Sequence, residues 1–352
     1  MHVLDLDTPA IAVDRTRMMA NLKRAQAHAD RLGVGLRPHI KTHKIPELAR
    51  LQIELGAKGL TCQKIGEAEV MADAGLGDIL IPYNIVGRAK LDRLAALARR
   101  TGIIVGADSA ETIEGYAAHF ADPGRPLQVL IECDTGGGRC GVQTPAAMLE
   151  LAKRIDAAPG LDLAGIFTYP PRGRIDAVEE WFAQAKDLAA RSGLPLRIIS
   201  NGGSPDFFPT QAAGSVTEHR PGTYIYSDRM QVSFGSGTLD DCALTVVATV
   251  VSRPTDDRAI LDAGSKALAA DTCALPGHGH IVEYPDAVIT ALNEEHGMVD
   301  VSRCATRPKV GDRVRIIPNH VCVVSNLFDE ITLVEDDNVV GTMKVAARGL
   351  LR

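Results

Sequence analysis

The sequence lacks the features that mark secreted and membrane proteins. No stretch reaches the roughly 20 uncharged apolar residues that a transmembrane helix needs. The segment Met1–Asp7 has neither a cationic start nor an apolar run, so no signal peptide is predicted. Net charge is −6 with 23% charged residues. That balance disfavours nucleic acid and membrane surfaces as partners. We therefore expect a cytoplasmic protein.

The sequence also lacks a CxxC pair, although it contains seven cysteines. An odd number of cysteines at irregular spacing argues against a disulfide framework and for reduced thiols. Most of them are expected to fill the core as small apolar side chains. They are Cys62, Cys133, Cys140, Cys242, Cys273, Cys304 and Cys322.

The first two thirds of the chain alternate short apolar runs with amphipathic, helix-like segments. A length of 352 residues favours two domains. Seven runs that are mostly apolar on both faces, with a weaker eighth, predict buried parallel strands of a (β/α)8 barrel over residues 8–226, with a doubly wound open sheet as the alternative. The runs are Leu36–Lys41, Gly59–Gln63, Asp78–Pro82, Gly102–Gly106, Leu127–Cys133, Leu163–Tyr169, Leu196–Asn201 and, more weakly, Ser215–Arg220.

After Tyr226 the helical pattern stops and β patterns take over. We predict a C-terminal antiparallel β domain over residues 227–352, and the opening strand Ala10–Asp14 is a candidate to pair with it. The predicted strands are Ala243–Val251, Arg258–Leu261, Met298–Val301, Arg313–Ile317, Val321–Ser325, Glu330–Val334 and Val339–Val345.

Lys41 closes the first apolar run of the barrel, in the segment RPHIKTHK at Arg37–Lys44. Active sites of such barrels lie at the carboxyl ends of the strands. Burial and neighbouring positive charge both favour the uncharged amine there. An amine of this kind is the usual nucleophile toward carbonyl compounds. The alternative is a lysine that merely lines a loop.

Two glycine-rich loops follow predicted strands. The paired Gly202 and Gly203 would let backbone N–H groups approach an anion, at the place where barrels often bind phosphate. The loop Asp134–Gly141 lacks the ending of a P-loop, so we interpret it as a loop that presents Arg139. A plain turn and an exposed cation are the respective alternatives.

His320 and Cys322 are two positions apart in a predicted strand, where they would face the same side. An imidazole and a thiolate favour Zn²⁺ among common metals. A core cysteine beside a satisfied histidine is the alternative. Glu295 and His296 are candidates to hydrogen-bond to these metal ligands and so to orient them.

Four motifs together resemble the family of D-threonine aldolases and eukaryotic-type D-serine dehydratases. The resemblance runs from about Thr8 to Val345. It implies the fold of type III pyridoxal-phosphate (PLP) enzymes, in which an alanine racemase-like barrel is joined to a β domain, and a homodimer. The motifs are RPHIKTHK, SNGGSP at Ser200–Pro205, HRPGTYIYSD at His219–Asp228 and PNHVC at Pro318–Cys322.

The same resemblance implies a role for each site residue. Lys41 would carry PLP as a Schiff base and, with His320 and Cys322, would be catalytic. The latter two would bind a divalent metal, Zn²⁺, Mn²⁺ or Mg²⁺. The remaining residues implied to bind the cofactor are Gln63, Arg139, Tyr169, Gly202, Gly203 and Tyr224.

The implied reaction is retro-aldol cleavage of a β-hydroxy-D-amino acid to glycine and an aldehyde. Dehydration of D-serine or 3-hydroxy-D-aspartate is an alternative, as are an amino-acid racemase and a non-enzymatic PLP-binding protein. Some family aldolases have His-x-Asp in place of His320-x-Cys322, and the thiolate here raises the dehydratase reading. Some also have a histidine that Pro170–Arg174 lacks, which leaves the aldolase base unidentified. The segments Ile81–Gly87 and Thr168–Pro171 look more like bacterial aldolases, which we prefer.

Overall fold

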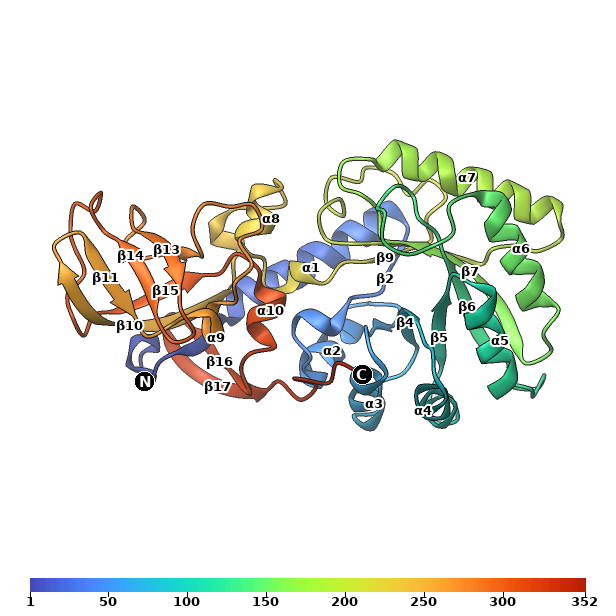
Figure 1. The fold of residues 1–352 in the computed structure, drawn as a ribbon, viewed down its shortest axis with the longest axis horizontal. Helices are drawn as coiled ribbons and strands as arrows, with labels where there is room; N and C mark the ends of the chain where they lie inside the picture. Colours follow the sequence, from blue (N-terminus) through green and yellow to red (C-terminus); the bar gives the residue numbers. More distant parts are fainter. The chain divides into compact units, whose positions relative to one another are not determined.

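The computed structural model describes residues 1–352, which form two compact units that interleave along the chain. We call them the barrel unit, comprising Ala25–Lys41, Pro46–Gly222 and Leu350–Arg352, and the sheet unit, comprising Met1–Arg24, Thr42–Ile45 and Thr223–Gly349. The chain therefore crosses from one unit to the other several times (Figure 1). Each unit is described separately below.

The barrel unit contains an eight-stranded parallel sheet in the order β2-β9-β8-β7-β6-β5-β4-β3. The two ends of this order are joined, because His39 bridges Thr61 and the N–H of Lys58 donates to the carbonyl of Leu36 at 2.8 Å. The predicted barrel is thus confirmed over the open sheet. Its strands are β2 (Gly35–Leu36), β3 (Leu60–Thr61), β4 (Ile79–Asn84), β5 (Ile103–Ala107), β6 (Leu127–Glu132), β7 (Leu161–Thr168), β8 (Ile198–Gly202) and β9 (Glu218–Arg220).

Helices cover the outside of the barrel strands (Figure 1). Their apolar faces pack on the strands in one large hydrophobic core. α6 shows how the sequence sets a helix start, since the Thr144 hydroxyl accepts the N–H of Ala147 and a proline takes the first position. The helices are α2 (Pro46–Glu54), α3 (Ile65–Asp73), α4 (Arg88–Ala98), α5 (Ala110–His119), α6 (Pro145–Asp156) and α7 (Ile175–Arg191). α1 (Arg15–Leu32) begins in the sheet unit and ends in the barrel unit.

The sheet unit contains a nine-stranded sheet. β1 pairs antiparallel with β10 and parallel with β16, so the opening strand belongs to this sheet and the sheet is mixed rather than purely antiparallel. The strands are β1 (Ala10–Asp14), β10 (Leu244–Thr255), β11 (Arg258–Leu261), β12 (His280–Ile281), β13 (Val288–Leu292), β14 (Gly297–Asp300), β15 (Arg313–Ile317), β16 (Glu330–Glu335) and β17 (Asn338–Lys344).

The prediction of a strand at Val321–Ser325 is wrong, because this segment forms the short helix α10. The buried carboxylate of Asp228 accepts the N–H of Val321 at 3.1 Å, which satisfies a helix-start donor that valine-rich sequence alone does not reveal. No helix of the protein combines the length and the apolar character required to cross a membrane. The other short helices are α8 (Arg229–Ser233), α9 (Ser265–Leu268), and the 3-10 turns η1 (Val3–Asp5), η2 (Ile40–Thr42), η3 (Thr223–Ile225) and η4 (Leu239–Asp241).

Candidate active site

Lys41 lies just beyond the carboxyl end of β2, half-buried, on the turn η2. It is not on a strand as predicted, because β2 ends at Leu36. Beyond Leu36 the pairing is reduced to a bridge between His39 and Thr61, because Pro38 has no N–H to donate, and the chain then turns into η2. The N–H of Lys41 approaches Nδ1 of His39 at 3.5 Å. The structure therefore keeps Lys41 at the predicted face of the barrel, on a tighter backbone than the sequence suggested.

His39 and Gln63 form a buried pair beside Lys41. His39 Nε2 lies 3.0 Å from the Gln63 side-chain oxygen. Burial, together with the charges of Lys41 and Arg220, holds the pKa of His39 well below its usual value. His39 is therefore neutral at physiological pH, and it holds the side chain of Gln63 at the carboxyl end of β3.

The carboxyl face of the barrel also brings together three other candidate residues, which are Arg139, Tyr169 and Gly203. The Arg139 guanidinium lies 4.7 Å from the centre of the Tyr169 ring. Arg139 Nη2 is 3.6 Å from a carboxylate oxygen of Glu132, at the end of β6. A Cβ added to Gly203 would lie 3.3 Å from Cε2 of Tyr169. Three residues that the sequence analysis selected from separate loops are thus neighbours.

The glycine turn after β8 leaves no room for side chains. Gly203 has a φ of +92°, a conformation that other residues adopt only with strain. A Cβ on Gly202 would lie 2.6 Å from Nη2 of Arg220 and 2.9 Å from the carbonyl of Thr168. The Ser204 hydroxyl accepts the N–H of Gly222 at 3.1 Å, which ties this turn to the end of β9. The turn, in which Gly202 and Ser204 are buried and Gly203 is half-buried, lies at the carboxyl ends of two strands, a position suited to an anion.

Arg220 is a residue that the sequence analysis did not select. It is 5% exposed and donates to the Ser200 hydroxyl and the Thr168 carbonyl, both at 2.6 Å. Burial lowers its pKa to about 10, although Glu218 and Glu132 act to raise it. The sequence does contain a pattern that could have identified Arg220. Glu218 and Arg220 are two positions apart on β9, so both side chains point into the barrel.

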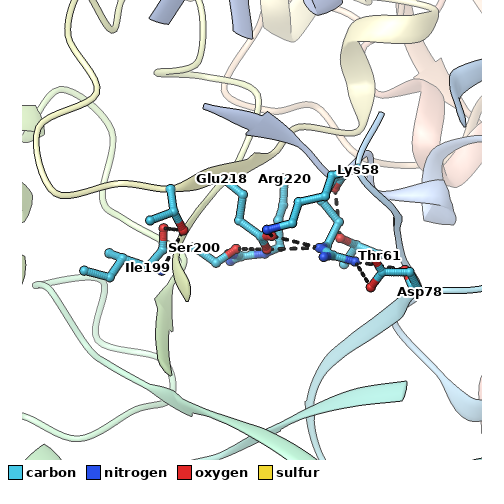
Figure 2. Close-up of polar contacts among 9 residues, drawn as sticks. Lys58, Thr61, Asp78, Ile199, Ser200, Glu218 and Arg220 are labelled. Carbon is cyan, nitrogen blue, oxygen red and sulfur yellow. Dashed lines mark hydrogen bonds and ion pairs between the residues drawn. The ribbon is translucent and has the colours of Figure 1, made fainter. Parts of the chain in front are cut away.

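A chain of polar contacts runs from the buried Arg220 through the barrel to the half-exposed Asp78 (Figure 2). The Ser200 hydroxyl donates to Glu218 at 2.7 Å, and Glu218 pairs with Arg37 at 3.0 Å. Arg37 in turn binds Asp78 at 2.8 Å. The chain thus joins residues at the beginnings of the strands to residues near their carboxyl ends.

In the sheet unit, His320 and Cys322 stand at the start of α10, on its N-cap and first turn. Their side chains interact, and Nδ1 of His320 lies 3.1 Å from a carboxylate oxygen of Asp271. Burial opposes the charged imidazole, but Cys322 and Asp271 together raise the pKa of His320 to about 9. The predicted pair is therefore adjacent, although on a helix start and not on a strand.

Two hydroxyl groups surround the Cys322 sulfur. Thr42 Oγ1 lies 3.1 Å from Sγ, and Thr223 Oγ1 lies 3.5 Å from it. Tyr224, the next residue, is buried on η3. Thr42 follows Lys41 directly in the sequence, so the backbone itself joins the candidate Schiff-base lysine to a residue that contacts Cys322.

The carboxylate that contacts the His320 imidazole is that of Asp271. The expectation that Glu295 and His296 support the metal ligands is wrong. Glu295 forms an exposed ion pair with Lys266 at 2.6 Å, and His296 is exposed. Asp271 lies 49 positions before His320, with no motif around it, so the sequence offered no signal.

Another cluster could accept a metal by distance alone. Oxygen and sulfur atoms of Asp108, Glu132 and Cys140 lie within 4.8 Å of one another. Burial raises the pKa of the Glu132 carboxyl, and Arg139 Nη2 lies 3.6 Å from it, so both the proton and the neighbouring cation compete with a metal ion there.

Comparison with known proteins adds two family matches. Residues 13–230 match the model described as alanine racemase, N-terminal domain, and residues 243–334 match the putative serine dehydratase domain. The chain is 37% identical to the D-threonine aldolase of an Arthrobacter species, covering 99% of this chain and 94% of the relative. It is 32% identical to the D-threo-3-hydroxyaspartate dehydratase of Delftia sp. (strain HT23), covering 97% of each chain.

Solved structures agree with these relatives. The crystal structure of D-threonine aldolase from Filomicrobium marinum superposes with a TM-score of 0.91 and 31% identity, covering 99% of this chain and 97% of that one. A D-threo-3-hydroxyaspartate dehydratase mutant, with a cysteine replaced by alanine and described as metal-free, superposes with a TM-score of 0.88 and 30% identity, covering 98% of each chain. A second mutant of such a dehydratase replaces a histidine two positions before that cysteine.

Proposed function

Because the chain belongs to the family that joins an alanine racemase-type barrel to a serine dehydratase-like domain and includes the D-threonine aldolases, we propose that it is a PLP-dependent lyase. Its reaction is the cleavage of a β-hydroxy-D-amino acid to glycine and an aldehyde. The observation that carries the proposal is the placement of Lys41, which lies at the carboxyl face of the barrel beside a neutral His39.

The residues at this face fit PLP. The glycine turn brings the backbone to the carboxyl ends of the strands where no side chain fits, since a Cβ on Gly202 would collide with Arg220 and Thr168. Backbone N–H groups of such a turn suit the cofactor's phosphate. When bound to Lys41, PLP supplies an electron sink for the bond broken at the substrate's Cα.

The chain's own side chains orient the cofactor and hold protons. Tyr169, with Arg139 stacked on its ring, presents a flat surface next to the glycine turn. His39 is neutral and fixed by Gln63, so it can keep a hydrogen bond without adding a charge near the lysine amine. Arg220 places a buried positive charge at the same end of the barrel. In this proposal Tyr224 contributes to the phosphate grip.

The donor set of His320 and Cys322 fits a divalent metal. Asp271 occupies Nδ1 of His320, which leaves Nε2 and the Cys322 thiolate to hold an ion. Thiolate and imidazole favour Zn²⁺, with Mn²⁺ and Mg²⁺ as the other candidates. The metal-free cysteine mutant of the related dehydratase supports this assignment. A metal ion there supplies a Lewis acid for the substrate's β-hydroxyl.

Dehydration to a keto acid and ammonia is the second candidate function. It is favoured by the thiolate in the metal pair and by the 32% identity to the Delftia dehydratase. A racemase would need a second base, and Tyr284 is the one tyrosine after Tyr226. Its hydroxyl donates to Asp312 at 2.9 Å, and burial with this neighbour raises its pKa to about 12, which argues against that role.

The proposal includes a cytoplasmic location and a homodimer. Size-exclusion chromatography with light scattering tests the homodimer.

Product identification tests the proposal. Purified protein is incubated with D-threonine and PLP, with and without EDTA. Glycine and acetaldehyde are expected, and EDTA should abolish their formation. 2-Oxobutyrate and ammonia would instead establish the dehydratase, and L-allothreonine a racemase. Activity that persists in the Lys41→Ala protein, or no turnover of any β-hydroxy-D-amino acid, would overturn the assignment.

A further inference from the structure

A cavity of about 660 Å³ opens at the end of the barrel where the strands begin. Its lining includes Asp78 and Gly102, which immediately precede β4 and β5, and Ile198, the first residue of β8. The candidate cofactor residues lie at the carboxyl ends of the same parallel strands. The cavity is therefore at the opposite mouth of the barrel and is a separate site.

The lining of this cavity is strongly cationic. Five of its side chains are positive and only Asp78 is negative, although the whole protein carries a net charge of −6. Asp78 is already bound by Arg37 at 2.8 Å. The positive side chains are Arg37, Lys58, Arg99, Arg100 and Arg125.

Several of these charges have no carboxylate of their own. Arg99 and Arg125 form no ion pair, and Arg125 Nη2 donates instead to the backbone carbonyl of Arg99 at 3.3 Å. Lys58 is half-exposed, and its ammonium lies 3.6 Å from Glu218 (Figure 2). Glu218 is shared, because it also pairs with Arg37 at 3.0 Å. Arg100 pairs with Asp73 and is the one surface cation with its own partner.

Helix geometry explains only part of this arrangement. Arg99 and Arg100 follow α4, whose carboxyl end favours cations. Lys58 precedes β3 and Arg125 precedes β6, so neither is placed by that helix. Three separate segments thus bring uncompensated positive charge to one cavity. The concave setting focuses the field of these charges.

We propose that this cavity binds a small anion with at least two negative charges, of the phosphate or polycarboxylate type. The guanidinium groups of Arg99 and Arg125 match the paired oxygens of either group in a bidentate manner. The ammonium of Lys58 adds a third contact from the barrel side. Arg37, which is 1% exposed and held by Glu218 and Asp78, forms the fixed positive floor.

Calorimetric titration tests the site. Protein that is saturated with PLP and then desalted, so that the cofactor's own phosphate position is filled and no free PLP remains, is titrated with inorganic phosphate and separately with citrate at constant ionic strength. Saturable binding of at least one anion is expected, and the two arms separate a phosphate ligand from a carboxylate ligand. The Arg99→Gln/Arg125→Gln protein should bind at least tenfold more weakly.

Arg88→Gln is the matched control, because Arg88 is an exposed arginine at the other end of α4 and does not line the cavity. It should bind as the wild type does. Equal affinity in the double variant, or no saturable binding of either anion to the wild type, would overturn the proposal. Crystals soaked in tungstate provide the location. An anomalous peak beside Arg99 and Arg125 is expected, and a peak confined to the glycine turn would contradict the site.

Discussion

A carboxylate oxygen of Asp271 lies 3.1 Å from Nδ1 of His320. This contact holds the orientation of the imidazole, which also interacts with the side chain of Cys322. Carboxylates that hold the far nitrogen of a metal-binding histidine also make the near nitrogen a stronger donor. Asp271 therefore acts as a positioning residue for the proposed metal site.

The Asp271→Asn protein should bind its metal about 10–100-fold more weakly, because the amide orients the imidazole without the carboxylate's charge. Competition with a fluorescent chelator measures this affinity. Turnover at saturating metal should recover most of its wild-type value, which distinguishes a positioning role from a general loss of structure. Asp286→Asn, an exposed aspartate of the same unit, is the control and should leave affinity unchanged.

Replacing Cys322 by aspartate should change which metal supports activity. A carboxylate is a harder ligand than a thiolate, so preference should move from Zn²⁺ toward Mn²⁺ or Mg²⁺. The measurement is turnover of metal-stripped protein after addition of each ion. Cys304→Ser, a buried cysteine outside the pair, should keep the wild-type order. The same metal order in Cys322→Asp would argue that Sγ is not a ligand.

The sequence predicted the barrel well for a physical reason. Strands buried on both faces are mostly apolar, so seven of the runs were recognisable, whereas β9 is polar throughout and the run that contains it was the weakest prediction. Lys41 was predicted at the correct end of the barrel but on a strand, whereas strand pairing ends at the His39 bridge and the chain then turns into η2. The helix α10 was mistaken for a strand because five valine-rich residues fit either structure.

The contacts that long-range folding creates could not be predicted. Asp271 reaches His320 across 49 positions, and Thr42 reaches Cys322 across 280. Neither residue type is unusual where it stands, and neither forms a local pattern. Only the folded chain shows which carboxylate and which hydroxyl meet the metal pair.

Gly203→Ala should weaken PLP binding at least tenfold. The added Cβ would meet the Tyr169 ring at 3.3 Å, and the φ of +92° would be strained. Gly193→Ala separates these effects, because Gly193 also has positive φ, at +74°, but a Cβ there meets nothing within 4 Å. Gly193→Ala should lower the melting temperature yet retain PLP. Absorbance of the bound cofactor during dialysis measures PLP retention in both variants, and thermal unfolding measures their melting temperatures. Equal loss of PLP from the two variants would argue that the glycine turn does not bind the cofactor.

The buried pair of Glu218 and Arg37 should make stability depend on acid. Burial opposes the charged carboxylate, but Arg37 and Ser200 hold the pKa of Glu218 below its usual value. The stabilisation is therefore complete at neutral pH and is lost as the pH falls through that lowered pKa. Glu218→Gln should cost about 3–5 kcal/mol at pH 7, as expected for breaking a buried ion pair.

Thermal unfolding between pH 7 and pH 3 checks the sign. The difference between wild type and Glu218→Gln should shrink as the pH is lowered, and a constant difference would show that charge is not its cause. Glu150→Gln provides the comparison, because Glu150 is exposed on α6 and its ion pair with Lys153 lies in water. Its melting temperature should match the wild type throughout.

The pairing of β1 has a consequence for synthesis on the ribosome. β1 occupies residues 10–14, yet its partners are the strand that begins at Leu244 and the strand that begins at Glu330. The first strand to emerge therefore waits for β10 until every strand of the barrel has been made, and for β16 until nearly the whole chain has been made. Unpaired strand edges favour aggregation during such a delay. A nascent chain that stalls before Glu330 would leave the edge of β1 that pairs with β16 without its partner. Completion of the last strands is therefore decisive for the recovery of intact protein.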